Sequence, residues 1–439
     1  MKVLKFGGTS VGSAQRMKDV AKLITDGEQK IVVLSAMSGT TNTLVEISDY
    51  LYKKNPEGAN EVINKLEAKY KQHIEELYST EEYKQKTLEF VKSVFDYIRS
   101  YTKDIFTLFE EKVILAQGEI ISTNMVTNYL CEQGVKATLI PALEFMRTDK
   151  NSEPDLTYIR EKLAIQLEAN PDYEIYITQG FICRNAYGAI DNRQRGGSDY
   201  TASLIGAAVN ASEIQIWTDI DGMHDNDPRI VDKTSPVRQL HFEEAAELAY
   251  FGAKILHPTC VQPAKYANIP VRLLNTMEPT APGTLISNET EKGKIKAVAA
   301  KDNITAIKIK SSRMLLAHGF LRKVFEIFES YQTAIDMVCT SEVGVSMSID
   351  NTKHLNEIVD DLKKYGTVTV DHDMCIVCVV GDLEWENVGF EAKALDAMRD
   401  IPVRMISFGG SNYNISFLIR EADKKKALQS LSDALFNNK

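Results

Sequence analysis

The chain has 439 residues, more than one hydrophobic core normally serves, so two or three domains are expected. Hydrophobic residues make up 44% and charged residues 26% of the chain, the balance of an ordinary globular protein, and no apolar run reaches the roughly 18 residues of a membrane-spanning helix. The N-terminus has no signal-peptide pattern and the net charge is −10, so we expect a cytoplasmic protein whose partners include neither nucleic acid nor membranes.

The first ten residues, MKVLKFGGTS, join a short apolar strand to a glycine turn. Lys5 lies in the strand, Gly7 and Gly8 follow it, and Thr9 and Ser10 favour the start of a helix. Backbone N–H groups of glycines can approach an anion closely, a helix N-terminus adds further donors, and Lys5 would place its charge on the same anion. The pattern indicates phosphate binding; an exposed lysine beside a plain surface turn is the alternative, and both stay open at this point.

Alternating strands and helices over the first 280 residues predict a domain built on a parallel α/β sheet. After the N-terminal strand, the expected strands span 31–37, 137–142, 174–180 and 213–219. Helical spacing of apolar residues over about 56–110 predicts a helical insertion over the sheet. Ligands of such sheets bind beyond the carboxyl ends of the strands, which is where the glycine-bearing and acidic stretches of this sequence fall.

The stretch NRQRGGSDYTASLIGAAV (192–209) carries the densest set of candidate ligands. Arg195 precedes two glycines, and Ser198 and Asp199 begin a helix of small residues. An arginine fork suits a carboxylate or a phosphate. Asp199 is either a helix cap or, beside anionic ligands, a group that orients a lysine or holds magnesium indirectly.

The segment 217–230 is rich in aspartate, does not match a calcium loop, and has a solvated acidic turn as its alternative interpretation. Arg229 and Lys254 add cations that a triphosphate requires, and His224 is a candidate to face a base. Glu119 is expected either to cap a helix start or to contact a ligand amine. Neither a GxxxxGK[ST] loop nor a GxGxxG fingerprint is present, which disfavours a P-loop or dinucleotide-binding protein.

Turn-forming residues predict a linker over 281–294, followed by an internal repeat with the order βαββα. The first copy spans 304–371 and the second spans 372–439. Because the second copy lacks a final strand, we expect 295–303 to complete its sheet, so that the first copy is inserted in the second. The repeat also contains Cys375 and Cys378, a CxxC in an apolar run that we interpret as core cysteines rather than metal ligands.

Stretches distributed along nearly the whole chain resemble, in order, the aspartokinase family: KFGGTS, LSAMSGTTN, QGE, the MRTD around Arg147, TQGF, RGGSDYTA, WTDIDG, DPR and FGAKILHP. The C-terminal repeat, with GFL and TSEVGVS, resembles the paired ACT regulatory domains of that family. The resemblance implies an α/β fold, with an N-terminal amino-acid kinase three-layer sandwich and two ferredoxin-like ACT domains. It implies transfer of the γ-phosphoryl group of ATP to the side-chain carboxylate of aspartate, the first step of lysine, threonine and methionine biosynthesis.

The resemblance also assigns roles to matching positions. Lys5 and Asp199 would be the catalytic pair, in which Lys5 stabilises charge on the transferring phosphoryl group and Asp199 orients it. Aspartate would be held by Thr41, Glu119, Arg195 and Ser198. ATP would be bound by Lys5, Gly7, Gly8, Ser10, Thr218, Asp219, His224, Arg229, Lys254 and Ile255. Mg²⁺ would bridge the ATP phosphates, with no protein side chain assigned to it.

The ACT resemblance implies feedback by an end-product amino acid, with lysine as the expected effector and threonine as the runner-up. The matching pocket positions are Met314, Gly319, Phe320, Leu321, Asp336, Thr340 and Ser341. Asp336 would pair with the ammonium group of the ligand. Effector sites of this kind imply a homodimer through the ACT domains, with a homotetramer as the alternative.

The sequence departs from the family pattern at three places. Asn192-Arg193-Gln194 stand where the family has Thr-Leu-Gly, His224 replaces a tyrosine, and Ala317 replaces a serine of the effector pocket. These changes bear on affinity rather than on the type of reaction. The alternatives are a related kinase acting on another carboxylate or carbamate and a non-catalytic amino-acid sensor, whereas no fused dehydrogenase is expected.

Overall fold

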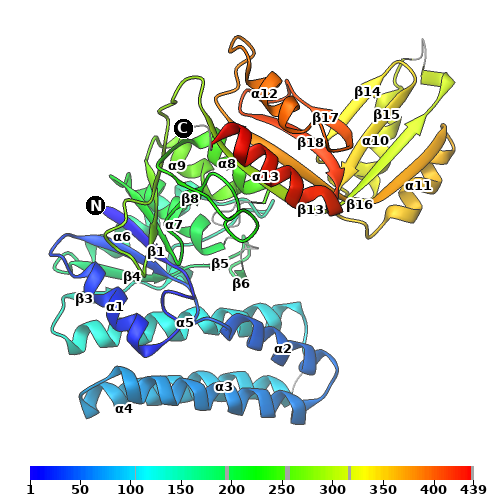
Figure 1. Ribbon diagram of the computed structural model, residues 1–439. Coiled ribbons are helices and arrows are strands. Elements are labelled where there is room, and N and C mark those ends of the chain that lie inside the picture. Colours follow the sequence, from blue (N-terminus) through cyan, green and yellow to red (C-terminus); the bar gives the residue numbers. More distant parts are fainter. Residues whose placement is uncertain (104, 193–196, 253–257, 315–317, 437–439) are drawn as a thin grey trace. The chain divides into compact units, whose positions relative to one another are not determined.

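The computed structural model describes residues 1–103, 105–192, 197–252, 258–314 and 318–436. The chain forms two compact units, one made of Met1–Met223 with Ile255–Asn288 and the other of His224–Lys254 with Glu289–Lys439. The first unit contains a mostly parallel sheet covered by helices, and the second contains an antiparallel sheet with its own helices (Figure 1). This architecture confirms the fold class predicted from the sequence.

The strands of the first unit lie in the order β12-β11-β7-β1-β2-β4-β3. All pairs are parallel except β11 with β12, and the apolar strands β2 and β4 are buried along their full length, as a sheet covered on both faces requires. Their bounds are β1 (Lys2–Phe6), β2 (Lys30–Leu34), β3 (Ala137–Leu139), β4 (Ile175–Gln179), β7 (Ile214–Thr218), β11 (Val271–Asn275) and β12 (Thr284–Ser287). A separate hairpin consists of β5 (Ile182–Arg184) and β6 (Ile190–Asn192).

The carboxyl edge of this sheet brings together four stretches that are distant in sequence. Gly7 follows β1, Ser35 follows β2, Gly180 follows β4 and Asp219 follows β7. The chain passes from β1 to β2 on one side, while β7 joins β1 on the other, so the strand order reverses beside β1. Such a switch point is where open parallel sheets bind ligands.

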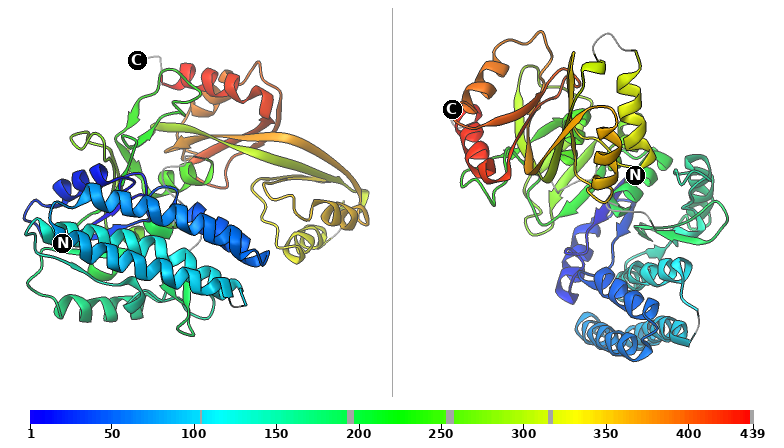
Figure 2. Two further views of the ribbon diagram at one scale, coloured as in Figure 1. Left: turned by 90° about the horizontal axis from the view of Figure 1, so that it is seen from below. Right: turned by 90° about the vertical axis from the view of Figure 1, so that its right-hand side faces the viewer.

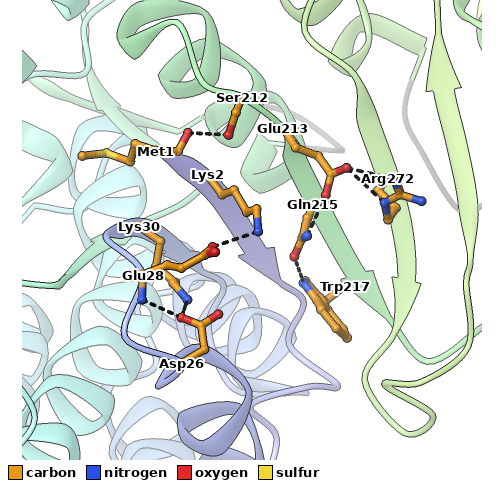
Figure 3. A network of polar contacts seen from close by, with 10 residues as sticks. All are labelled: Met1, Lys2, Asp26, Glu28, Lys30, Ser212, Glu213, Gln215, Trp217 and Arg272. Atoms are coloured by element: carbon orange, nitrogen blue, oxygen red, sulfur yellow. Dashed lines mark hydrogen bonds and ion pairs between the residues drawn. The ribbon is translucent and has the colours of Figure 1, made fainter.

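The amino edge of the same sheet is closed by polar contacts between neighbouring segments (Figure 3). Lys2 pairs with Glu28 at 2.8 Å, and Arg272 of β11 pairs with Glu213 at 3.0 Å. These pairs satisfy polar groups locally, which leaves the carboxyl edge as the edge with candidate ligand-binding groups.

Helices cover the parallel sheet and extend into a bundle made by α2, α3, α4 and α5 (Figure 2). Tyr70 and Phe95 of the bundle are fully buried, and the hydroxyl groups of Tyr70 and Thr40 lie 2.8 Å apart. The helices of this unit are α1 (Ala14–Ile24), α2 (Thr40–Tyr52), α3 (Pro56–Leu77), α4 (Glu81–Ser100), α5 (Leu108–Glu132), α6 (Leu156–Glu168), α7 (Gly197–Val209) and α9 (Gln262–Tyr266), with short 3₁₀ turns at Tyr101–Lys103, Ala142–Glu144 and Pro258–Cys260.

The sheet of the second unit has the order β14-β15-β13-β16-β18-β17 and is antiparallel. Its bounds are β13 (Ile295–Lys310), β14 (Val338–Ser341), β15 (Gly344–Ile349), β16 (Thr367–Gly381), β17 (Val403–Ser407) and β18 (Asn414–Arg420). Its helices are α10 (Phe320–Ser330), α11 (Leu355–Lys363), α12 (Phe390–Ala397) and α13 (Lys424–Leu435), with 3₁₀ turns at Ser312–Met314 and Glu421–Asp423.

The two long strands β13 and β16 join both copies of the repeat into one sheet. The first half of β13, from Ile295 to Lys301, pairs with the second half of β16, and the second half of β13 pairs with β15 and with the start of β16. Helices α10 and α11 bury one core against one end of these strands, and α12 and α13 bury another against the other end (Figure 2). Segments that the sequence predicts as separate strands are therefore continuous, with bulges where the pairing register shifts.

Two boundaries differ from the sequence expectation. Residues 281–294, expected as a linker, contain β12. The segment His224–Lys254, expected in a catalytic domain over 1–280, belongs to the second unit because its backbone is bonded there: Val298 N–H donates to the carbonyl of Asp225 at 2.8 Å. The segment contains β9 (Pro236–Val237), β10 (Gln239–His241) and α8 (Phe242–Tyr250), while β8 (Met223–His224) lies at the division between the units.

Cys375 and Cys378 are fully buried in β16, in agreement with their interpretation as core residues. The cysteines in the described residues form no disulfide. None of the helices in the described ranges has the length and apolarity needed to cross a membrane.

Candidate active site

Lys5 and Asp199 form an ion pair at the carboxyl edge of the sheet. Lys5 extends from β1 and Asp199 from the first turn of α7, and Lys5 Nζ lies 2.7 Å from Asp199 Oδ1. Their side chains are 11% and 13% exposed, so water screens this pair only partly. The structure thus brings together the two residues that the sequence resemblance assigns as the catalytic pair.

The glycine turn after β1 leaves open space beside this pair. A Cβ at Gly7 would lie 3.4 Å from Lys5 Nζ, and a Cβ at Gly8 would lie 2.8 Å from the carbonyl oxygen of Ala36. A side chain at Gly8 would clash with the neighbouring loop, whereas a Cβ at Gly7 would only reach van der Waals contact with the end of the lysine side chain. Both glycines therefore keep backbone close to Lys5, as an anion-binding turn requires.

The helix after this turn begins later than the sequence suggests. Helix α1 starts at Ala14, and its N-cap is Ser13, whose side chain accepts a bond from Arg16 N–H. Ser10, predicted to cradle phosphates, is only 1% exposed, and its hydroxyl lies 2.8 Å from that of Thr276. A helix start at Thr9 and Ser10 is wrong because Gly12 intervenes and Ser13 supplies the cap.

Ser198 lies next to Asp199 and is held from the end of β2. Ser35 Oγ donates to Ser198 Oγ at 3.0 Å, and Ser122 Oγ donates to the Ser35 carbonyl at 2.8 Å. A Cβ at Gly180 would overlap the Ser198 side chain, so glycine is needed at the end of β4. Three strand or helix ends therefore meet at this predicted substrate ligand.

Glu119 projects from the middle of α5, so its expected role as a helix-start cap is wrong. The residue is 3% exposed, and its Oε1 accepts a hydrogen bond from Ala36 N–H at 3.2 Å. In the described part of the chain, Oε2 has no hydrogen-bond partner. Burial raises the pKa of Glu119 to about 8, and the Ala36 N–H offsets this only in part. A buried carboxylate with a free oxygen is suited to a ligand cation, the second role expected for this residue.

The predicted nucleotide residues fall in both units. Thr218 ends β7 in the first unit and Asp219 follows it; Thr218 Oγ1 accepts from Ile220 N–H at 3.2 Å, and Asp219 is exposed. His224 and Arg229 belong to the second unit; His224 Nδ1 lies 2.9 Å from Thr234 Oγ1, and Arg229 makes a bidentate pair with Asp227.

Several predicted positions cannot be placed in the site. Arg195, Lys254 and Ile255 lie outside the described residues, as do Ala317 and the Arg193-Gln194 part of the family departure. Thr41 is half-buried in the first turn of α2.

Comparisons with known proteins identify the family of this chain. A model of the amino acid kinase family matches residues 1–275, and a model of the ACT domain matches residues 377–435. The chloroplastic aspartokinase 1 of Arabidopsis thaliana is 35% identical over 99% of this chain and 80% of its own length. Lysine-sensitive aspartokinase 3 of Escherichia coli is 31% identical over 99% of both chains.

The chain belongs to the aspartokinases. Solved aspartokinase structures share its fold: E. coli aspartokinase III in complex with aspartate and ADP, in the R-state, has a TM-score of 0.86 at 31% identity and covers 99% of this chain and 100% of its own. The same E. coli enzyme in complex with lysine and aspartate, in the T-state, has a TM-score of 0.80 at 32% identity, with 99% of each chain covered. The family identified from the sequence motifs is confirmed.

The expected effector residues of this aspartokinase lie in the first copy of the repeat. Gly319 caps α10 with a φ of 80°, and Phe320 and Leu321 begin that helix. Thr340 and Ser341 lie on the edge strand β14, and Met314 ends the 3₁₀ turn after β13.

The side chain of Asp336, another of the expected effector residues, is only 1% exposed. Its Oδ1 lies 2.7 Å from Lys301 Nζ and accepts from the Tyr250 hydroxyl at 2.7 Å. Both partners come from segments distant in the chain, so neither could be inferred from the residues around Asp336.

Other site residues were not singled out from the sequence. Ser35 and Gly180 belong to matched motifs but received no role, and Thr276 belongs to none. Phe181 has a φ of 66°, a left-handed conformation that is uncommon for a bulky residue. In the sequence, Phe181 is marked only by its place in the TQGF motif, directly after Gly180.

Proposed function

We propose that this chain transfers the γ-phosphoryl group of ATP to the β-carboxylate of L-aspartate, giving 4-phospho-L-aspartate, the first step in the synthesis of lysine, threonine and methionine. The observation that carries the proposal is the enclosed Lys5–Asp199 pair beside the Gly7-Gly8 turn, with Ser198 next to it. The E. coli relative bound to aspartate and ADP supports the choice of substrates.

Lys5 is proposed to stabilise the negative charge that spreads over the phosphoryl oxygens during transfer. Asp199 holds the ammonium group at 2.7 Å and so orients it before the phosphate arrives. Because the acceptor carboxylate is already an anionic nucleophile, this site needs positioning and charge neutralisation more than a general base.

Glu119 is proposed to bind the α-ammonium group of aspartate. Its second oxygen is buried without a partner within the described ranges, and burial raises its pKa to about 8. Ser198 and Thr41 would contribute hydrogen bonds to the same substrate, and Arg195 would bind a carboxylate. An amine-bearing acidic substrate satisfies these groups better than a simple carboxylate or carbamate does.

Mg²⁺ would enter with ATP. No group of three or more His, Cys, Asp or Glu side chains within the described residues could hold a metal ion, so the donor set fits an ion coordinated mainly by phosphate oxygens. When bound, Mg²⁺ supplies charge neutralisation between the phosphates. The contribution of this chain is the ammonium group of Lys5 and the N–H groups of the glycine turn.

The reaction can be tested by trapping the acyl phosphate with hydroxylamine in the presence of ATP and Mg²⁺, with aspartate and glutamate assayed side by side. Hydroxamate should form with aspartate and at most slowly with glutamate. A chain that forms no hydroxamate with aspartate is not an aspartate kinase. The Asp199→Asn variant controls for contaminating kinases and should lose the activity.

Regulation by lysine is the second part of the proposal, with threonine as the competing effector. Its support is the lysine-sensitive E. coli relative and the buried carboxylate of Asp336 in the first ACT copy. We assign that copy to 304–371 and the second copy to 295–303 with 372–439, and propose a homodimer through the ACT domains. Titration of an active assay with each amino acid identifies the effector, and sedimentation tests the dimer against a tetramer.

A further inference from the structure

Asp336 has a partner that the proposed effector site does not explain. The Tyr250 hydroxyl is the last polar group of α8, and it donates to Asp336 Oδ1 at 2.7 Å. Lys301 Nζ lies 2.7 Å from the same oxygen and 4.4 Å from the centre of the Tyr250 ring. The three side chains join α8, β13 and the start of the β14 hairpin within the second unit.

Asp336 still has room for one more donor. Its side chain is 1% exposed, and Oδ2 has no hydrogen-bond partner in the described parts of the chain. A buried carboxylate oxygen gains strongly from a new cationic donor. An ammonium group of an effector can therefore add to Asp336 without displacing the two groups on Oδ1.

The two existing donors would respond differently to an added positive charge. Lys301 is repelled by it and has a second partner, Asp350 Oδ2, at 2.9 Å, to which it can shift. Tyr250 is neutral, since burial and then the bond to Asp336 raise the pKa of its hydroxyl to about 12. The tyrosine is thus the donor that stays with the carboxylate when the ligand binds.

Helix α8 continues directly into a stretch of chain packed on β13. A Cβ at Gly252 would overlap the carbonyl oxygen of Ala300, the residue before Lys301, and Gly252 has a φ of 110°. Phe251 is buried and makes an edge contact with the Tyr250 ring at 5.0 Å. Lys254, which the family resemblance assigns to nucleotide binding, comes two residues after Gly252 in the sequence.

We propose that Tyr250 is a positioning residue that transmits occupation of the Asp336 carboxylate by an amino-acid ammonium group to α8 and the chain after it. The inference rests on the proposed effector role of Asp336 and adds the residue through which the effector reaches the catalytic reaction. In this proposal Asp336 binds the ligand, and Tyr250 transmits the binding to α8.

The test compares the full-length wild-type chain with Tyr250→Phe, which removes only the hydroxyl group. Basal kcat and the KM values for aspartate and ATP should stay within about 2-fold, and lysine binding measured by calorimetry within about 3-fold. The lysine concentration for half-inhibition should rise about 10-fold or more, the range of a typical coupling between sites. Asp336→Asn should instead lose lysine binding itself.

Tyr331→Phe is the matched control. Tyr331 lies in the same copy and its hydroxyl donates to Asp361 at 2.9 Å, so the change removes the same kind of bond away from Asp336. Its inhibition curve should match that of the wild type.

Two outcomes would overturn the inference while leaving the proposed function intact: a Tyr250→Phe chain inhibited as the wild type is, or one that loses lysine binding and inhibition together. If the wild type forms the hydroxamate but neither lysine nor threonine inhibits it, the proposed regulation fails and the inference falls with it. If hydroxamate is absent, the proposed reaction itself is wrong.

Discussion

Each unit contains a buried carboxylate with one oxygen that lacks a hydrogen-bond partner among the described residues, but the two carboxylates have different neighbours. Glu119 in the first unit has one backbone donor, Ala36 N–H, and burial raises its pKa to about 8. Asp336 in the second unit has an ammonium group and a hydroxyl group on its other oxygen.

The two carboxylates therefore differ in whether the protein itself supplies a cation: Asp336 has one in Lys301, and Glu119 has a single backbone N–H donor. Burial keeps Glu119 mostly protonated at neutral pH, and an added cation would favour its ionised form, so its environment suits an amine-bearing substrate. Asp336 is already neutralised by Lys301, so a ligand there changes an existing balance rather than creating one.

The largest expected effect is a loss of kcat at Lys5, a residue outside both carboxylate sites. Lys5→Ala should lower kcat by about 10³-fold, because a charge positioned on the transferring phosphoryl group is lost. Lys2→Ala is the matched control at the other end of the same strand, where the lysine pairs with Glu28, and it should retain normal kcat. More than a tenth of the wild-type rate in Lys5→Ala would refute the catalytic role of Lys5.

The internal cation of the second unit can be removed directly. Lys301→Met leaves the buried Asp336 carboxylate without a cation and should lower the free energy of unfolding by about 3 kcal/mol, measured in urea. Adding Asp336→Asn should recover most of that loss, because no charge then remains to be paired. Lys363→Met, which breaks an exposed pair with Asp360, should leave the midpoint unchanged. An unaltered midpoint in Lys301→Met would mean that Asp336 needs no cation, and the contrast with Glu119 would disappear.

The proposed contact of Glu119 with the ammonium group of aspartate can be tested through the KM for aspartate. Glu119→Gln keeps the shape of the side chain but removes its charge, and should raise the KM for aspartate about 30-fold with a smaller change in kcat. Glu67→Gln, at a carboxylate paired with Lys71 and Arg99 in the helical bundle, should leave KM unchanged. An unchanged KM in Glu119→Gln would remove the proposed ammonium contact.

The direction of the pKa shift of Glu119 predicts how aspartate binding depends on pH. The folded pKa of Glu119, about 8, lies above the ordinary value of 4.5, so the free enzyme holds a proton there at neutral pH and loses stability as the pH rises toward 8. Binding of an ammonium group favours the ionised form and releases that proton. The KM for aspartate should therefore fall between pH 6 and pH 8, by at most about 10-fold per pH unit, and then level off.

Glu119→Gln should flatten this KM profile, and aspartate should protect the wild type against thermal unfolding more strongly at pH 8 than at pH 6. A wild-type KM that does not vary across that range would contradict the assignment of the proton to Glu119.

The smallest expected effect concerns the turn beside Lys5. A methyl group at Gly8 would lie 2.8 Å from the Ala36 carbonyl oxygen, so Gly8→Ala should displace the turn and lower kcat/KM about 10-fold. Gly410→Ala is the control in the second unit, where nothing lies within 4 Å of the added carbon. Equal activity of both variants would show that the close approach at Gly8 is not needed for phosphate binding.

Much of the fold and of the site is local in the sequence and could be predicted from it. Apolar runs ending in glycine or aspartate determined the parallel strands and the edge where ligands bind. The Lys5–Asp199 pair followed from motif identity, because both side chains leave the ends of elements that the sequence pattern already defines. The insertion of one repeat in the other followed from counting strands, and the pairing of Ile295–Lys301 with β16 has that form.

The tertiary structure alone decided the rest, because it depends on contacts between residues far apart in the chain. The hydroxyl of Ser10 contacts that of Thr276, 266 positions away, and helix α1 starts at the Ser13 cap. The segment His224–Lys254 joins the second unit through backbone bonds to β13. Asp336 is paired with Lys301 of β13 and accepts a hydrogen bond from Tyr250 of α8. The spacing of these residues in the sequence does not predict that they are in contact.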